Sequence, residues 1–222
     1  MPLSFANQRQ AIVDAAELLV RSGVLSHSRH GNSSVRLPDG QSLLITGVST
    51  LLNTSPESLV VVDLDGGVRE GSLAPTSAEI VGMHAVVYRV RPDVGAVIHT
   101  HSPMVTTYAM AHTPLPIHYE GLLRLGVSAD IPLAAWGPRG SRESIAHIEE
   151  ALTAHPQASA VLLANHGLLA FGPDQAFVAQ LIVSLEEAAE TMLLAERLGG
   201  SRPFPPGALE QVRDRMRAFA SA

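Results

Sequence analysis

The sequence contains no cysteine. This absence excludes disulfide scaffolds, thiolate nucleophiles and cysteine-bound zinc, so any metal ion must be held by histidine and carboxylate side chains. No apolar run approaches the roughly 20 residues of a membrane span, and the first residues lack the basic stretch and apolar segment of a signal peptide. We therefore expect a cytoplasmic protein without a membrane partner.

Basic residues are scarce as well. Lys and Arg total 15 against 21 Asp and Glu, and the formal net charge of −6 disfavours nucleic acid as a partner. Apolar residues make up 46% of the 222 residues, which is enough to bury a full core. The length predicts a single domain over residues 1–222. Ten histidines stand beside only nine aromatic residues, and this balance directs attention to imidazole chemistry.

Hydrophobic spacing predicts a mixed fold. Helices are expected over residues 8–23, 77–90 with Thr76 or Ser77 as its cap, from 103 onward, 141–154, 174–198 and 207–219. Turn residues between short extended runs predict hairpins over 33–46 and 59–70, and continuous apolar strands are expected over 94–101 and 161–164. Hairpins mixed with helices favour an α+β or a three-layer α/β/α fold over a doubly wound parallel sheet.

Two histidines end the first apolar strand. Since side chains alternate along a strand, His99 and His101 project on the same side and can converge on one divalent ion. A third ligand must come from elsewhere, and His166, which follows the second strand and precedes the flexible Gly167, is the best candidate. Glu79, early in the preceding helix, can complete the coordination sphere or accept a proton. On spacing alone, however, a His-x-His pair is more often two partly exposed histidines than a metal site.

Small polar groups gather at three other places. The segments are 31–36 (Gly-Asn-Ser-Ser-Val-Arg), Thr46-Gly47, and Thr76-Ser77 at a helix start, where backbone N–H groups can bind an anion. A turn or a cap explains each of them as simply. His27 and His30 precede the first segment. Either a contact with the substrate or simple exposure to solvent would explain these two histidines. A structural or solvent-facing role suits the remaining histidines, His84, His112, His118, His147 and His155.

Six motifs occur in a fixed order along the chain. They are Gly-Asn-x-Ser-x-Arg at 31–36, Thr-Ser-Ala-Glu at 76–79, Met-His-x-x-x-Tyr at 83–88, Arg-Pro-Asp-Val at 91–94, His-Thr-His at 99–101 and Asn-His-Gly-Leu at 165–168. With these motifs the chain resembles the class II aldolase and adducin head-domain family from about Gln8 to Gly200. The resemblance implies a three-layer α/β/α fold, in which helices flank a central and mainly antiparallel sheet. It also implies a homotetramer with sites at subunit contacts.

The resemblance also implies roles for single residues. His99, His101 and His166 match the metal ligands, with zinc expected and manganese or cobalt also suited to such ligands. Glu79 matches the acidic residue that binds metal in the free site and transfers a proton. Tyr119 resembles the tyrosine that protonates the departing aldehyde. The positions that match the family's phosphate cradle are Asn32, Ser34, Thr46, Gly47, Thr76 and Ser77.

Four positions depart from the family pattern. Glu79 lies five residues before His84 where the common spacing is four, so its role needs a local bulge or a shifted helix start. The loop after Ile45 is one residue short. Arg29 replaces a small hydroxyl residue and can pair with a substrate carboxylate. Phe219 stands where the family's aldolases carry a C-terminal tyrosine.

These observations lead to one main hypothesis and several alternatives. The main hypothesis is a divalent-metal-dependent lyase, similar to fuculose-phosphate aldolases, that cleaves a C–C bond in a ketose phosphate or related hydroxyketone. A cation would stabilise the enediolate that cleavage leaves behind. A metal-dependent decarboxylase of a keto or aromatic acid is the second candidate, since loss of CO₂ also leaves an enolate-like anion. A sugar-phosphate epimerase or dehydratase comes next, followed by a non-catalytic module like the adducin head, which would be expected to lack ligands.

Overall fold

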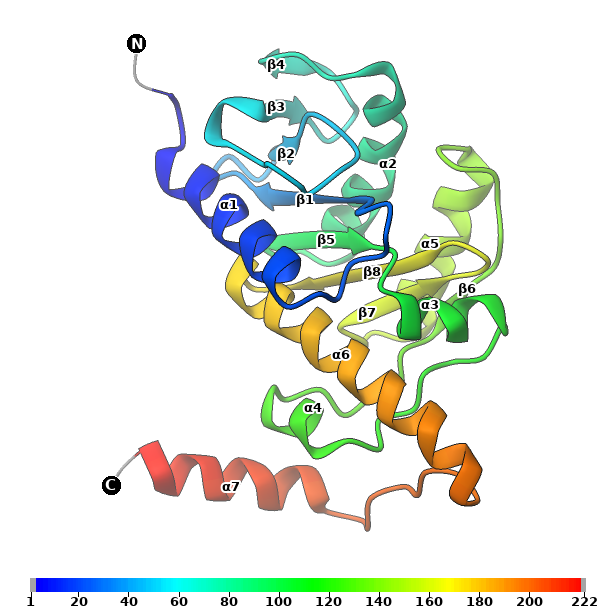
Figure 1. The fold of residues 1–222 in the computed structure, drawn as a ribbon. Coiled ribbons are helices and arrows are strands. Elements are labelled where there is room, and N and C mark those ends of the chain that lie inside the picture. Colours follow the sequence, from blue (N-terminus) through cyan, green and yellow to red (C-terminus); the bar gives the residue numbers. More distant parts are fainter. Residues whose placement is uncertain (1–2, 221–222) are drawn as a thin grey trace.

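The structure is a computed structural model that describes residues 3–220, without the side chains of Thr76 and Ala220 (Figure 1). Eight strands of the described chain form one sheet: β1 (Gly31–Arg36), β2 (Ser42–Thr46), β3 (Leu59–Asp63), β4 (Val68–Glu70), β5 (Ala96–Thr100), β6 (Leu133–Ala134), β7 (Ala160–Leu163) and β8 (Gly167–Gly172). Their order is β4-β3-β2-β1-β5-β8-β7-β6, and only the β6–β7 pair is parallel. The expected mainly antiparallel sheet is confirmed.

Helices cover both faces of this sheet. They are α1 (Ala6–Arg21), α2 (Pro75–Val90), α3 (Pro103–Met110), α4 (Glu120–Arg124), α5 (Arg142–Ala154), α6 (Gln175–Ala195) and α7 (Ala208–Ala220), with short 3₁₀ turns over Pro56–Ser58 and Glu196–Leu198. Helices α1, α3 and α6 pack on one face and α2 and α5 on the other, while α4 and α7 lie outside α6 (Figure 1). The three-layer α/β/α arrangement is therefore confirmed.

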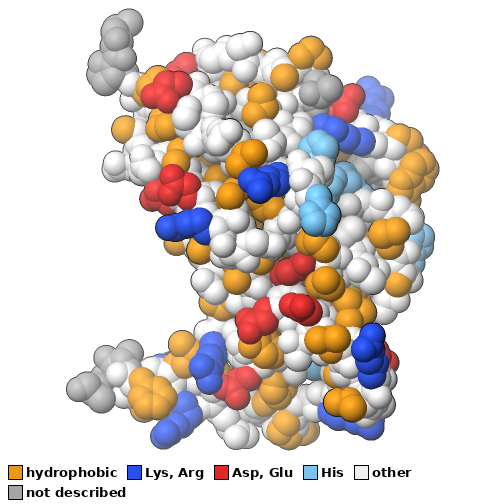
Figure 2. Space-filling model, viewed as in Figure 1, with side chains coloured by type: hydrophobic (Ala, Val, Ile, Leu, Met, Phe, Trp, Pro, Cys, Tyr) orange, Lys and Arg blue, Asp and Glu red, His pale blue; other side chains and the backbone are white. Residues whose placement is uncertain are grey.

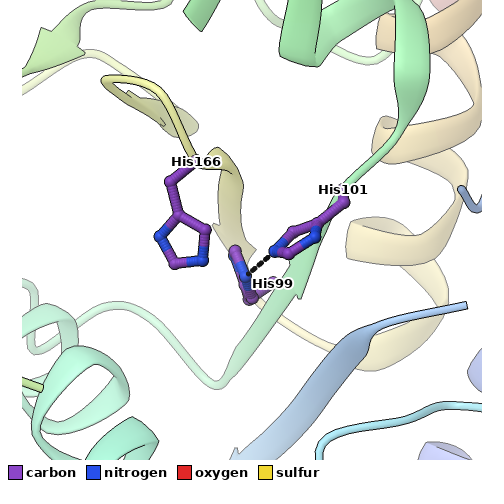
Figure 3. Close-up of side chains that lie close together, drawn as sticks. All are labelled: His99, His101 and His166. Atoms are coloured by element: carbon purple, nitrogen blue, oxygen red, sulfur yellow. Dashed lines mark hydrogen bonds between the residues drawn. The ribbon is translucent and has the colours of Figure 1, made fainter. Parts of the chain in front are cut away.

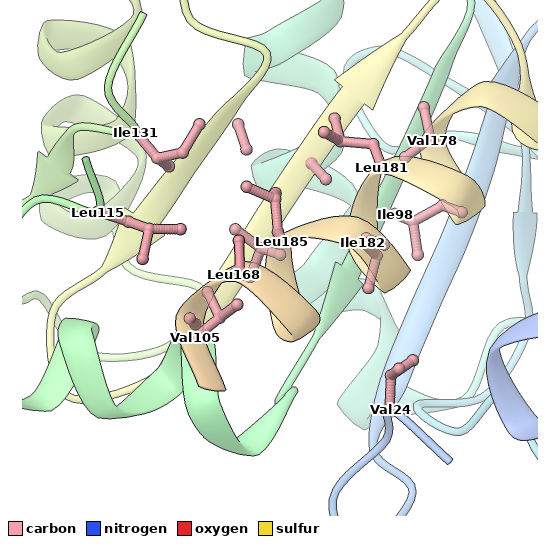
Figure 4. Packing of buried hydrophobic residues seen from close by; sticks show 14 of the residues in the cluster. Val24, Ile98, Val105, Leu115, Ile131, Leu168, Val178, Leu181, Ile182 and Leu185 are labelled. Atoms are coloured by element: carbon pink, nitrogen blue, oxygen red, sulfur yellow. The ribbon is translucent and has the colours of Figure 1, made fainter. Parts of the chain in front are cut away.

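The central strand β5 shows how the sequence divides the core in two. Successive side chains of a strand point to opposite faces, so Ile98 joins the cluster beneath α6 while its neighbour Val97 joins the cluster beneath α2 and α5. Figure 4 shows Ile98 beside the apolar side chains of α6. The same alternation directs His99 to the face covered by α2, and this placement decides where the site forms.

Most predicted elements lie within two or three residues of their observed bounds. The long helix α6 ends in a 3₁₀ turn and then Gly199, whose φ of 95° stops the helix in the left-handed region. Strand β8 was not predicted, nor were α4 and β6. The predicted cap of α2 was wrong, because the helix begins at Pro75 after Ala74, and no side chain caps it. Proline suits this position because it needs no hydrogen-bond partner for its nitrogen.

Among the helices of residues 3–220, none combines the length and the apolar character needed to cross a membrane.

Candidate metal centre

Three histidines meet at one edge of the sheet. His99 is the fourth residue of β5, His101 follows the end of that strand, and His166 lies in the tight turn between β7 and β8. Because β5 pairs with β8, the turn returns beside the end of β5, and the three rings face one another (Figure 3). Their centroids lie 4.7–4.9 Å apart, and one ligand nitrogen from each lies within 4.8 Å of the others.

Gly167 allows this approach, for a reason that differs from the one the sequence suggested. Its φ is not positive, so backbone freedom is not what the position requires. A Cβ atom here would lie 2.5 Å from the carbonyl oxygen of Thr100 and 2.9 Å from the ring of His101. Only glycine lets the turn pack this closely. The left-handed residue is instead Asn165, at φ 58°, and its Oδ1 lies 2.7 Å from His112 Nε2.

The three imidazoles are neutral at physiological pH. Burial, followed by the neighbouring His166 and His101, lowers the pKa of His99 well below its ordinary value. Burial likewise lowers the pKa of His101 to about 4 and that of His166 below its ordinary value. Metal ligation needs the neutral ring with a free lone pair. The site therefore holds its ligands in the protonation state that a cation requires.

The ring orientations fit a divalent cation. The Nδ1 of His99 donates to the carbonyl oxygen of Leu168 at 2.8 Å, which leaves Nε2 of His99 as the ligand atom. This Nε2 lies 3.1 Å from Nε2 of His101. Two nitrogens bound tetrahedrally to zinc at 2.0–2.1 Å would be about 3.3 Å apart. The spacing of this pair thus matches that of two imidazoles bound to one zinc ion.

A pocket of about 100 Å³ opens beside the three rings. Figure 2 shows histidine side chains grouped at the surface with an arginine beside them. The other wall residues are His30, Gly31, Asn32, Ser49, Glu79, Ile80, Met83, Arg139, Gly140, Ser144 and Ile145.

Residues 10–193 match the family model described as Class II Aldolase and Adducin N-terminal domain. The chain belongs to the class II aldolase and adducin family. It is 31% identical to a 5-methylthioribulose-1-phosphate/5-deoxyribulose-1-phosphate aldolase of Rhodospirillum rubrum, over 99% of this chain and 95% of that one. It is also 31% identical to a 3-oxo-tetronate 4-phosphate decarboxylase of Haemophilus influenzae, over 78% and 84%. A solved L-fuculose 1-phosphate aldolase matches with a TM-score of 0.82, 25% identity and coverage of 97% and 98%.

Glu79, the expected acidic residue, reaches the pocket wall from α2. Helix α2 is regular, so the separation of five positions between Glu79 and His84 places their side chains about 140° apart around its axis. His84 accordingly lies buried against the sheet, while Glu79 is 52% exposed on the pocket wall. Ile80 occupies the position four residues before His84. Glu79 is not among the three clustered ligand residues, and its carboxylate faces Arg139 instead.

Of the positions expected to form a phosphate cradle, Asn32 lines the pocket. Thr46 is buried and accepts a hydrogen bond from the Ser33 backbone at 3.3 Å. The N–H of Gly47 donates to the carbonyl oxygen of Ser58, and a Cβ there would meet that oxygen at 2.7 Å. The side chain of Ser77 is buried behind the pocket, 3.5 Å from Ser49 Oγ. The side chain of Thr76 lies outside the described residues.

Ser34 joins a closed network beneath α2. The ring of His84 is fully buried, and its Nε2 donates to Asn32 Oδ1 at 2.5 Å, while its Nδ1 accepts from Ser34 Oγ at 2.7 Å. Tyr88 adds contacts from its hydroxyl to Ser34 Oγ and to the Ser34 carbonyl oxygen. Burial lowers the pKa of His84 to about 3, so the ring is neutral. With its oxygen engaged, Asn32 offers its amide nitrogen to the pocket.

Three further predicted positions lie away from the pocket walls. Arg29 is exposed, with a φ of 51°. The hydroxyl of Tyr119 donates to Glu187 on α6 at 2.9 Å. Phe219 is 72% exposed near the end of α7.

Sequence reasoning missed Ser49, Arg139 and Ser144, and left His30 undecided. His30 lines the pocket, with its ring 5.8 Å from that of His101, whereas His27 is exposed and not part of the wall. The signal for Arg139 is weak in sequence, because it lies in a Gly-Pro loop about 40 residues after the His-x-His strand. No local pattern connects that loop with α2.

Proposed function

We propose that this protein is a divalent-metal-dependent lyase that cleaves a C–C bond in a ketose phosphate or a related hydroxyketone. The observation that carries the proposal is the convergence of three neutral imidazoles beside a pocket that also contains a carboxylate. A divalent cation held by His99, His101 and His166 would supply Lewis-acid stabilisation of negative charge on substrate oxygens. Zinc suits this ligand set, as do manganese and cobalt.

The composition supports this chemistry over the other route to aldol cleavage. The 222-residue sequence contains no lysine, so this chain offers no side-chain amine to form a Schiff base with a carbonyl substrate. Negative charge on the nucleophilic carbon fragment must then be stabilised electrostatically. Glu79, which is on the pocket wall and partly open to solvent, takes and returns the proton at this carbon.

The relatives indicate the class of substrate. The similar protein of Rhodospirillum rubrum is named for two ribulose 1-phosphates that lack the ordinary 5-hydroxyl group, and the structural match is named for fuculose 1-phosphate. Both are ketose 1-phosphates. We infer that this chain also takes a ketose phosphate, with Asn32 among the groups that bind its anionic end.

Tyr119 fits its proposed role only in an assembly. In one chain its hydroxyl is held by Glu187 outside the pocket walls. A homotetramer with sites at subunit contacts would bring Tyr119 to the aldehyde oxygen in a neighbouring subunit's pocket. There the tyrosine would take the hydroxyl proton when the aldehyde leaves and return it in the condensation direction. A single domain over residues 1–222 and a cytoplasmic location remain predictions.

The test combines metal analysis with a substrate screen. Purified protein should contain close to one divalent ion per chain, and His99→Ala should lose it; equal metal content in both proteins would refute the site. Ketose 1-phosphates, including fuculose and ribulose derivatives, are then screened for aldehyde release in the metal-loaded protein. CO₂ is detected separately with keto acids, because the similarity to a 3-oxo-tetronate 4-phosphate decarboxylase favours decarboxylation as the second candidate. Release of CO₂ without aldehyde would replace the lyase proposal by that one.

A further inference from the structure

Arg139 is the one arginine among the described residues that line the pocket. It lies in the loop between β6 and α5. Its Nη2 donates to Ser49 Oγ at 3.1 Å, and its Nε lies 3.6 Å from Glu79 Oε2. Its charge contributes, after burial, to the lowered pKa of His166. The guanidinium therefore lies between the imidazole cluster, the carboxylate and the loop after β2.

The loop that carries Arg139 is packed firmly against its neighbours. Gly140 adopts a φ of 71°, and a Cβ atom there would lie 2.7 Å from the Cβ of Glu79. At Gly137 a Cβ atom would lie 2.6 Å from the backbone nitrogen of Ser144. The N–H of Ser141 closes the turn on the carbonyl oxygen of Pro138 at 3.0 Å. These contacts fix the base of the arginine side chain at the pocket.

The contact between Arg139 and Glu79 is weak enough to be exchanged. The separation of 3.6 Å is longer than a hydrogen bond, and the two side chains are 44% and 52% exposed. Ion pairs of this kind contribute about 0–1 kcal/mol. A phosphate or carboxylate group, by contrast, offers a guanidinium two parallel, charge-assisted hydrogen bonds.

We propose that Arg139 binds the anionic group of the substrate and exchanges Glu79 for that group when the substrate enters. The exchange leaves the carboxylate of Glu79 without its arginine partner, and therefore available for the proton of the reacting carbon. The release of Glu79 rests on the proposed function, whereas the binding of an anion by Arg139 does not. The chemistry recognised is an oxyanion, from either a phosphate ester or a carboxylic acid.

The test is titration calorimetry of metal-loaded protein with inorganic phosphate and, in a second arm, acetate. Arg139→Gln should weaken binding of the preferred anion about tenfold or more, as expected for loss of a charge-assisted hydrogen bond. Arg139→Lys should give a smaller loss. The control is Arg142→Gln, which removes the same charge from an exposed residue three positions away and should leave the affinity unchanged. If the affinity for phosphate depends on Arg139, the anionic group of the substrate is a phosphate ester. If only the affinity for acetate depends on Arg139, that group is a carboxylic acid.

A second variant tests the exchange itself. Glu79→Gln removes the competing partner of Arg139 and a negative charge from the pocket, so it should tighten anion binding several-fold at equal metal content. Affinities within twofold of the wild type for both anions in Arg139→Gln would overturn the proposal, and an unchanged affinity in Glu79→Gln would overturn the exchange. Neither measurement requires turnover, so a failed substrate screen would not affect them.

Discussion

Replacing the buried His84 tests the network that orients Asn32. In His84→Leu, Asn32 Oδ1 loses its partner in the network, whereas Ser34 Oγ keeps the hydroxyl of Tyr88 at 2.9 Å. One buried polar atom is thus left unsatisfied, which costs about 1–3 kcal/mol. We expect the free energy of unfolding at pH 7.5 to fall by about 2 kcal/mol. The exposed His27→Leu serves as control and should change it by less than about 0.5 kcal/mol.

The same variant should become the more stable protein in acid. Burial lowers the pKa of His84 to about 3 from its ordinary 6.5. Between these values the unfolded chain binds a proton that the folded chain excludes, so the folded state loses stability as the pH falls below 6.5. The loss is about 1.4 kcal/mol per pH unit, or nearly 3 kcal/mol at pH 4.5. His84→Leu escapes this loss, so the order of stabilities should reverse between pH 7.5 and 4.5.

Urea unfolding of both proteins at the two pH values measures this directly. An unchanged slope with shifted midpoints would show that the variant differs in stability alone. If His84→Leu has the same free energy of unfolding as the wild type at pH 7.5, the side-chain carbonyl of Asn32 does not need the imidazole as its hydrogen-bond partner. If the variant is still the less stable protein at pH 4.5, the ring is not held neutral, and the reasoning about the network fails.

Two further changes probe the fold and the centre. Arg9 is 1% exposed and donates hydrogen bonds to the carbonyl oxygens of Pro56 and Leu59 and to Glu70. Arg9→Met should therefore lower the free energy of unfolding, measured by urea titration, by about 3–5 kcal/mol. A loss below about 1 kcal/mol would contradict this expectation. Gly167→Ala would place a Cβ atom 2.5 Å from the Thr100 carbonyl oxygen and displace the turn that carries His166. The zinc affinity, measured by chelator competition, should therefore fall about tenfold. An unchanged affinity would mean that the turn adapts without moving this histidine.

The histidine cluster was predictable because it depends on local rules. Alternation along a strand put His99 and His101 on one side, and the six motifs identified His166 as their partner. Strand β8 is not evident from the sequence because it follows β7 after only three residues. The pattern around His166 therefore predicts the end of a strand and not a turn within a hairpin. Its pairing with β5 is what brings His166 to the other two rings.

The rest of the pocket depends on long-range packing. Arg139 comes from the loop before α5 and Ser144 from the first turn of that helix. Gly140 sets the contact of this loop with α2, and a sequence pattern in either segment says nothing about the other. The exposed position of Glu79 follows from its place on α2, about 140° around the helix axis from the buried His84. Tyr119 shows a different limit, since its hydrogen bond to Glu187 lies outside the pocket walls and its proposed role needs another subunit.

The Nε2 atoms of His99 and His101 lie close together because backbone pairing within the sheet holds the ends of its strands in place. This has a practical consequence. A cation entering this centre meets ligands that already stand in position, so little of its binding energy goes into reorganising the chain. Dialysis against a chelator should then yield a folded apoprotein that accepts cobalt in place of the native ion. The visible absorption of Co²⁺ would report coordination number and anion entry without any turnover assay.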